Sequence, residues 1–259
     1  SAQGLKSLLE QSASGPKGCG MTSSEPTDKP KRFYKKAAVE PTDDGWTVAL
    51  DGRTIKTPAR AGLILPTERL ARAIAAEWQA QDAHIDLLAM HLTRLANVAI
   101  DRAEETREEM ADELARYCET DLICHIADTP DELAEAEEKH WAPVRDWAGD
   151  TLGVNLVPVI GIVASPQPDS SLEAARDHAL SLDAFRLTGL LFGAGLFGSA
   201  LLALAVEQEA LSAEDAYEIS RIDEAWQADH WGEDDEAKAA TEARRLEAKA
   251  LGVWFRALV

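Results

Sequence analysis

The chain is poor in cysteine, and the few it has do not form a recognisable pattern. Its three cysteines, Cys19, Cys118 and Cys124, are an odd number, which argues against the disulfide framework of a small secreted protein. The spacing of Cys118, Cys124 and the adjacent His125 matches no standard zinc motif, and a fourth ligand is missing. These cysteines therefore indicate structural thiols in a reducing compartment and predict no metal site.

The sequence also lacks the short motifs that mark the common catalytic and nucleotide-binding sites. It contains no GxGxxG, GxxxxGK[ST], GxSxG or HExxH. His84 and His91, with Asp86 nearby, could in principle bind a metal, but their spacing does not force them to converge. These patterns therefore do not favour a metal site or an enzyme.

Two acid–base pairs keep one enzymatic alternative open. Asp112 with His125, and Asp177 with His178, combine groups that general acid–base catalysis uses. No activated nucleophile accompanies either pair. The alternative is a carboxylate- or metal-dependent hydrolase of unknown substrate.

Positive charge is scarce. The chain carries 26 Lys and Arg against 46 Asp and Glu, for a formal charge of -20 and a pI near 4.6. Such a surface repels nucleic acid and anionic membranes, so neither is an expected partner. With 46% hydrophobic residues over 259 positions, the chain can bury a core of one large domain or two ordinary ones.

Only one long hydrophobic run is present, at residues 187–206, where twenty residues carry no charge. Its length would suffice to span a bilayer. Charged residues stand close on both sides, at Asp183, Arg186, Glu207 and Glu209, and the run has no Lys/Arg-rich flank. We therefore expect a buried central helix and no membrane insertion.

The first thirty residues are predicted to lie outside the fold. Residues 1–20 precede Met21 and are typical of an expression remnant, and the polar stretch after them is expected to be a flexible N-terminus. Because no Arg-rich amphipathic segment follows Met21, we expect the bacterial cytoplasm rather than the mitochondrial matrix.

Residues 32–65 favour an antiparallel sheet. Short β-favouring runs at 33–40, 46–50, 53–57 and 62–66 are separated by turn signals, the strongest being Asp51-Gly52. Thr67 then caps a predicted helix whose apolar residues, Leu70, Ile74, Ala75 and Trp78, recur at helical spacing. Trp78 is expected to be a structural core residue.

The rest of the chain is predicted to be mostly helical. Helices are expected over residues 87–100, 104–117, 130–152, 172–185, 212–231 and 234–258. Residues 121–127 fit either a strand or a helix. Residues 155–171 contain three prolines and mark a break, expected to be either an extended segment or a loop that crosses between domains.

The segment 220–236 is the most informative. On a helix, Ile219, Ile222 and Trp226 form one stripe, which predicts a structural role for Trp226. Glu224, Gln227 and Trp231 lie opposite, where a tryptophan beside carboxylates is typical of a contact patch. The alternative is a solvated acidic helix with one exposed tryptophan. Gly232 is expected to end the helix.

Five segments together carry a resemblance to a known family. They are residues 31–60, beginning KRFYKK, then AAEWQAQ at 75–81, MHLTRLAN at 90–97, TDLICH at 120–125 and SRIDEAWQADHWG at 220–232. In combination these segments resemble the assembly chaperone that handles the alpha subunit of the F-type ATP synthase catalytic head. The resemblance covers residues 31–258.

The resemblance implies an α+β protein: a small antiparallel β-rich N-terminal domain with helices, at 31–128, and a mainly α-helical orthogonal bundle at 129–259. It implies a monomer without catalysis or cofactor that binds unassembled alpha subunit. The family's functional acidic position corresponds to Asp223 or Glu224. We therefore predict that Asp223, Glu224, Gln227 and Trp231 bind the partner.

Overall fold

The structure is a computed structural model that describes residues 29–161, 163 and 165–259. The expectations for the expression remnant and for Cys19 lie outside these residues. By internal contacts the chain divides into two compact units, one ending at Glu105 and also including Arg256–Val259, the other comprising Thr106–Phe255. The domain boundary expected between residues 128 and 129 stays a prediction.

Unit 1 contains a three-stranded antiparallel sheet, in the order β1-β2-β3. Its strands are β1 (Ala37–Thr42), β2 (Gly45–Leu50) and β3 (Arg53–Thr54). Both expected hairpins are confirmed, because Thr42 pairs with Gly45 across the first turn and Leu50 pairs with Arg53 across the second. The expected fourth strand at 62–66 is wrong. That segment makes only isolated bridges, Trp46 to Leu65 and Lys56 to Gly62.

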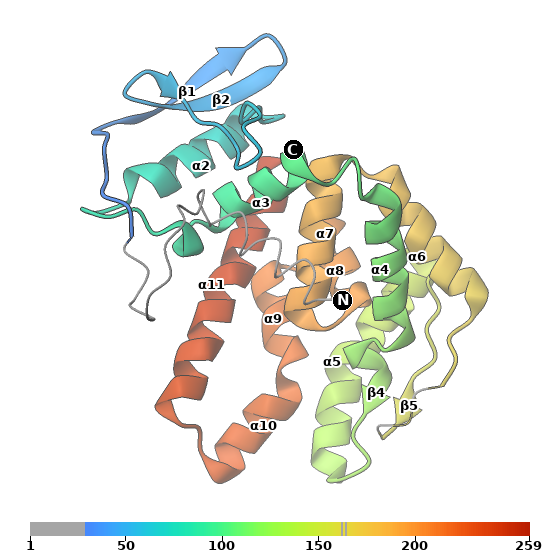
Figure 1. Cartoon of the computed structure of the whole chain (residues 1–259). Helices are drawn as coiled ribbons and strands as arrows, with labels where there is room; N and C mark the ends of the chain where they lie inside the picture. The colour runs from blue at the N-terminus through green and yellow to red at the C-terminus, as the bar shows by residue number, and fades with distance from the viewer. Residues whose placement is uncertain (1–28, 162, 164) are drawn as a thin grey trace, which may run out of the picture. The chain divides into compact units, whose positions relative to one another are not determined.

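Helix α2 (Glu68–Gln79) packs against β1 and β2, and Figure 1 shows the sheet lying across it. The cap prediction is confirmed, since the Thr67 hydroxyl accepts a hydrogen bond from the Leu70 N–H at 3.1 Å. The four apolar positions predicted for the core are all buried. A 3-10 helix, η1 (Leu87–Ala89), and helix α3 (His91–Asp101) come next in the chain.

Unit 2 is mainly helical, and with the sheet of unit 1 it confirms the predicted α+β class. Its first elements are α4 (Arg107–Glu119), η2 (Leu122–Cys124), β4 (His125–Ile126), α5 (Asp131–Leu152), β5 (Val159–Ile160) and α6 (Asp169–Ser181). The remaining helices are α7 (Ala184–Phe197), α8 (Ala200–Glu207), α9 (Ala213–Ser220), α10 (Ile222–Trp231) and α11 (Asp235–Ala257), the last of which ends in unit 1.

The long hydrophobic run forms two helices, α7 and α8, and the expected single helix is wrong. Gly198 ends α7 with a φ of 66°, a conformation that glycine adopts at little cost. Ser199 then starts α8, its hydroxyl accepting from the Leu202 N–H at 3.0 Å. Within the described part of the chain, no helix is long and apolar enough to cross a membrane.

The two halves of the run form the core of unit 2, as expected for apolar segments. All eight residues of α8 are buried, and this helix contacts α4, α5, α7 and α9. Gly189 of α7 permits close packing, because a Cβ there would lie 2.8 Å from ring atoms of Trp254 and Phe255. Gly189 therefore lowers the helix propensity of α7 but allows close contact with α11.

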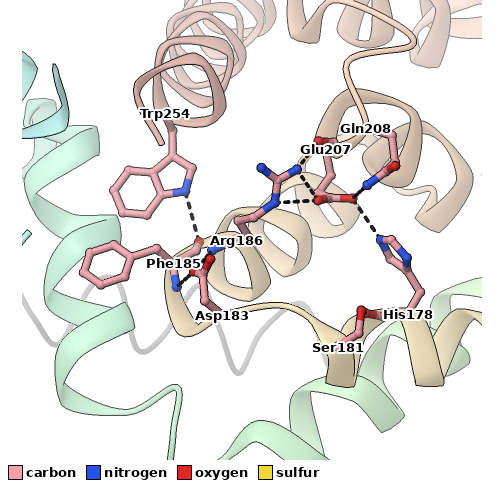
Figure 2. Close-up of polar contacts among 8 residues, drawn as sticks. All are labelled: His178, Ser181, Asp183, Phe185, Arg186, Glu207, Gln208 and Trp254. Atoms are coloured by element: carbon pink, nitrogen blue, oxygen red, sulfur yellow. Dashed lines mark hydrogen bonds and ion pairs between the residues drawn. The ribbon is translucent and has the colours of Figure 1, made fainter. Parts of the chain in front are cut away.

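A buried carboxylate joins the ends of three of these helices. Glu207, the last residue of α8, accepts hydrogen bonds from Arg186 Nε at 2.8 Å and Gln208 Nε2 at 2.7 Å, and lies 2.9 Å from His178 Nε2 (Figure 2). Burial raises the pKa of Glu207, but the hydrogen bonds from His178, Gln208 and Arg186 outweigh it and hold the pKa below its usual value. This network fixes the carboxylate in its ionised form.

Candidate partner-binding surface

The first two segments of the family resemblance meet inside unit 1, where they support each other. Tyr34 is buried, and its hydroxyl donates to the Trp78 carbonyl at 2.6 Å while the two rings meet edge to face at 5.8 Å. Arg32 donates to the carbonyls of Tyr34 at 3.1 Å and Gln79 at 3.2 Å. These contacts account for KRFYKK and EWQAQ as structural segments, in keeping with the expected role of Trp78.

Glu77 ties the next segment, MHLTRLAN, to the same place. Its carboxylate accepts from the N–H groups of Leu92 at 2.7 Å and Thr93 at 2.9 Å, in the first turn of α3. These N–H groups have no partner within the helix. Burial raises the pKa of Glu77 despite these hydrogen bonds. The sequence patterns did not reveal this residue, because Glu77 lies within α2 and its partners are fifteen and sixteen residues later in the chain.

Asp121 has the equivalent role for the TDLICH segment in unit 2. It is fully buried, and its carboxylate accepts from the Leu201 N–H at 3.0 Å, in the first turn of α8, and from the Ile123 N–H at 3.2 Å. Burial raises its pKa to about 6, against the effect of hydrogen bonds that include those from Ser199 and Leu201. The first four segments therefore have structural explanations.

The last segment, SRIDEAWQADHWG, has no comparable explanation in the core. The expected helix over 212–231 is interrupted, because α9 ends at Ser220 and α10 begins at Ile222. The expected stripe of Ile219, Ile222 and Trp226 is only half-buried, and no residue of α10 is buried. Gly232 ends α10 as predicted, with a φ of 81°. The helix therefore lies on the surface of unit 2.

Arg221 holds the start of α10 in place, a role that no local pattern in the sequence indicates. Its guanidinium lies 5.7 Å from the Tyr217 ring centre, donates to the Thr241 hydroxyl of α11 at 3.2 Å and approaches Glu224 at 3.9 Å. Tyr217 in turn donates its hydroxyl to the Thr241 carbonyl at 3.0 Å. These contacts orient the α9–α10 junction against α11 and place Glu224 outward.

The aromatic residues of α10 form one cluster at its C-terminal end. Trp226 stacks on His230 with ring centres 3.8 Å apart, and Trp231 meets Trp226 edge to face at 5.6 Å. His230 Nδ1 lies 2.7 Å from the Trp226 carbonyl. Trp231 nevertheless remains 74% exposed. The cluster holds a large apolar side chain outward in a defined orientation.

The four predicted partner-binding residues are brought together on the outer surface of α10. Asp223, Glu224, Gln227 and Trp231 are all exposed. Gln227 donates to the Asp223 carboxylate at 2.9 Å, one helical turn away. We call these four residues the α10 face. The α10 face combines one exposed ring with carboxylates, a composition suited to binding a protein rather than to catalysis. Its role in partner binding stays a prediction.

The candidate acid–base pairs are not brought together. Asp112 forms an ion pair with Arg176 at 2.6 Å, and His178 bonds to Glu207 instead of its neighbour Asp177. His125 Nδ1 lies 3.3 Å from the Gly161 carbonyl. In the described ranges, no group of three or more His, Cys, Asp or Glu is arranged to hold a metal ion. Cys118 and Cys124 are buried free thiols.

Comparison with known proteins identifies the family of this chain. The family described as ATP12 chaperone protein matches residues 31–149. The crystal structure of Atp12 from Paracoccus denitrificans is 38% identical, covers 89% of this chain and 99% of its own, and superposes with a TM-score of 0.82. The chain belongs to the ATP12 chaperone family.

Two further relatives extend the comparison. A candidate chaperone from Agrobacterium tumefaciens is 30% identical over 99% of this chain and 98% of its own, with a TM-score of 0.85. The mitochondrial protein atp12 of Schizosaccharomyces pombe is 26% identical over 223 residues, 81% of this chain and 77% of its own. The family match ends at residue 149, so the α10 face lies outside it, while the structural matches span most of the chain.

Proposed function

We propose that this chain binds the unassembled alpha subunit of the F-type ATP synthase catalytic head and shields the surface that the beta subunit later covers. Membership of the ATP12 chaperone family supports a chaperone role, and the resemblance of the segment 220–232 supports this client. The observation that carries the proposal is the exposure of Trp231, held outward among carboxylates on a helix with no buried residue.

A free subunit of an oligomer exposes an apolar interface, and large apolar patches aggregate. An aromatic side chain such as Trp231 can bind in such a patch, while the surrounding carboxylates keep the chaperone soluble and choose among surfaces by charge. Binding must be weaker than that of the cognate subunit, so that replacement of the chaperone is favourable. We therefore propose a monomeric, transient partner without a catalytic step.

The relatives come from two kinds of compartment. The fission yeast protein is named as mitochondrial, and the solved relatives come from bacteria. Because the bacterial relatives are 38% and 30% identical to this chain and the mitochondrial protein is 26% identical, we propose that this chain acts in a bacterial cytoplasm.

The test is co-purification from cells that express the tagged chain with either the alpha or the beta subunit alone. We expect capture of the alpha subunit only, and loss of the complex when purified beta subunit is added. Capture of neither subunit, or equal capture of both, would overturn the proposed client.

A further inference from the structure

The paired strands β4 and β5 leave an apolar edge of unit 2 uncovered. They form a two-stranded parallel sheet in which Ile126 pairs with Ile160, extended by a hydrogen bond from the Gly161 N–H to the Ile126 carbonyl at 2.8 Å. Parallel strands are usually buried on both faces, and an unpaired strand edge is a template for another strand. No described strand pairs with the outer edge of β5, and Ile160 is 73% exposed.

A groove accompanies this edge. It has a volume of about 400 Å³ and is lined on one side by Ile126, Pro158, Val159 and Ile160, and on the other by Ala134, Glu135 and Glu138 of α5. Gln167 holds the approach to β5 extended, because its side chain accepts from the Val157 N–H at 2.7 Å and donates to the Val157 carbonyl at 3.0 Å. The groove is therefore an ordered feature with an apolar floor.

The α5 wall of the groove is acidic and partly fixed. Glu138 receives both hydrogen bonds from the Arg145 Nη2 atom, at 2.8 and 2.7 Å, and Arg145 is itself buried. Glu135 lies one turn earlier on α5, so the two carboxylates share a face. An extended apolar segment that carries a lysine or arginine would match both the floor and the wall.

The same charges argue against a second copy of this chain as the occupant. A second copy also has a net charge of -20 and carries the same exposed Glu135, so it offers this acidic wall no excess of cations. Like charges in contact across an interface cost binding free energy. Charge complementarity therefore selects a basic, apolar partner.

The groove and the α10 face are linked through α5. Glu137 of α5 accepts from the Ala127 N–H, just after β4, at 2.7 Å. Burial raises the pKa of Glu137, and the nearby charge of Asp223 on α10 raises it further. Figure 1 places α10, the first turns of α5, β4 and β5 at the same end of unit 2, and α10 contacts α5. A client bound to α10 can therefore reach the groove.

We propose that the groove between β5 and α5 binds an extended apolar segment of the alpha subunit, pairing it as an added strand with β5 and a lysine or arginine of that segment with Glu135. This inference rests on the proposed function. Strand addition supplies main-chain hydrogen bonds, and the groove supplies the side-chain selection.

The first test is photo-crosslinking in the full chain co-expressed with the alpha subunit. A benzophenone amino acid replaces Ile160, Trp231 or, as a control, Leu88, which is 57% exposed in unit 1. We expect crosslinks to the alpha subunit from Ile160 and Trp231 but not from Leu88, and the peptide linked to Ile160 to be apolar with a basic residue.

The outcomes separate the two proposals. A crosslink from Trp231 without one from Ile160 overturns the groove and leaves the proposed function standing, whereas the absence of any complex overturns both. A crosslink from Ile160 to a second copy of the chain also overturns the inference.

Two variants then test the apolar floor and the acidic wall of the groove. Ile160→Asp should weaken alpha-subunit binding by about tenfold or more, because it removes an apolar anchor. Glu135→Lys should weaken it by about threefold or more, with the loss shrinking at high salt. The matched controls Leu88→Asp and Glu173→Lys, at exposed positions of η1 and α6, should bind as the parent does. Equal losses in variants and controls would contradict the inference.

Discussion

Replacing Asp121 by asparagine should change the pH dependence of stability by a predictable amount. The carboxyl has a folded pKa of about 6 against an ordinary value of 3.8 because it is fully buried. A carboxyl whose pKa is raised by folding adds stability that is full below 3.8 and is lost as the pH rises through about 6. Between pH 7.5 and pH 5.0 the parent should therefore gain roughly 1 to 2 kcal/mol from this one group.

The Asp121→Asn variant has no such gain, and its amide N–H₂ must face one of the N–H donors, Ile123 or Leu201, which costs about 1 to 3 kcal/mol. Urea unfolding of both proteins at the two pH values gives the double difference, in which all other titrating groups cancel. The variant should fall further behind the parent at pH 5.0 than at pH 7.5. A gap that stays constant, or that narrows at pH 5.0, would refute the reasoning.

Three further variants test the packing inside each of the two units. Glu207→Gln should destabilise the protein by about 3 to 5 kcal/mol at neutral pH, because it leaves Arg186 without its buried partner. Because the folded pKa of Glu207 lies below its ordinary value of 4.5, this loss should shrink only below that pH, where acid protonates the carboxylate in the parent; thermal melts at pH 7 and about pH 3 measure it. Trp78→Ala should cost about 3 to 5 kcal/mol in urea unfolding, and a change below about 1 kcal/mol would contradict its core role. Gly189→Ala should cost roughly 1 to 3 kcal/mol, since the new Cβ meets the Trp254 ring; an unchanged melting temperature would show that the ring can move freely.

Local signals in the sequence predicted the parts of the fold that local interactions determine. The Asp51-Gly52 hairpin, the Thr67 cap and the Gly232 helix end depend on a few neighbouring residues, and each is where it was expected. The break between α7 and α8 had a local signal too, because Gly198 and Ser199 are a common helix stop followed by a common helix start. The uncharged apolar residues on both sides of Gly198 and Ser199 instead favoured the prediction of one continuous helix.

Contacts between distant segments could not be predicted in the same way. Residues 125–126 pair with residues 159–160 across an entire helix, and nothing in either dipeptide specifies the other. In the candidate site, too, local spacing was predictable and a contact between distant segments was not. Helical spacing grouped Glu224, Gln227 and Trp231, but the support from Arg221 depends on Thr241, twenty residues later on another helix.

The α10 face can be tested directly by measuring how much alpha subunit stays soluble when it is co-expressed with this chain. Glu224→Ala combined with Trp231→Ala removes the exposed carboxylate and ring, and the control, Phe33→Ala with Glu173→Ala, removes an exposed ring and an exposed carboxylate elsewhere. The parent and the control double variant should keep the alpha subunit soluble. The α10 double variant should bind the alpha subunit about tenfold or more weakly, so that the alpha subunit appears in the insoluble fraction. Undiminished solubility with a folded α10 double variant would contradict the account.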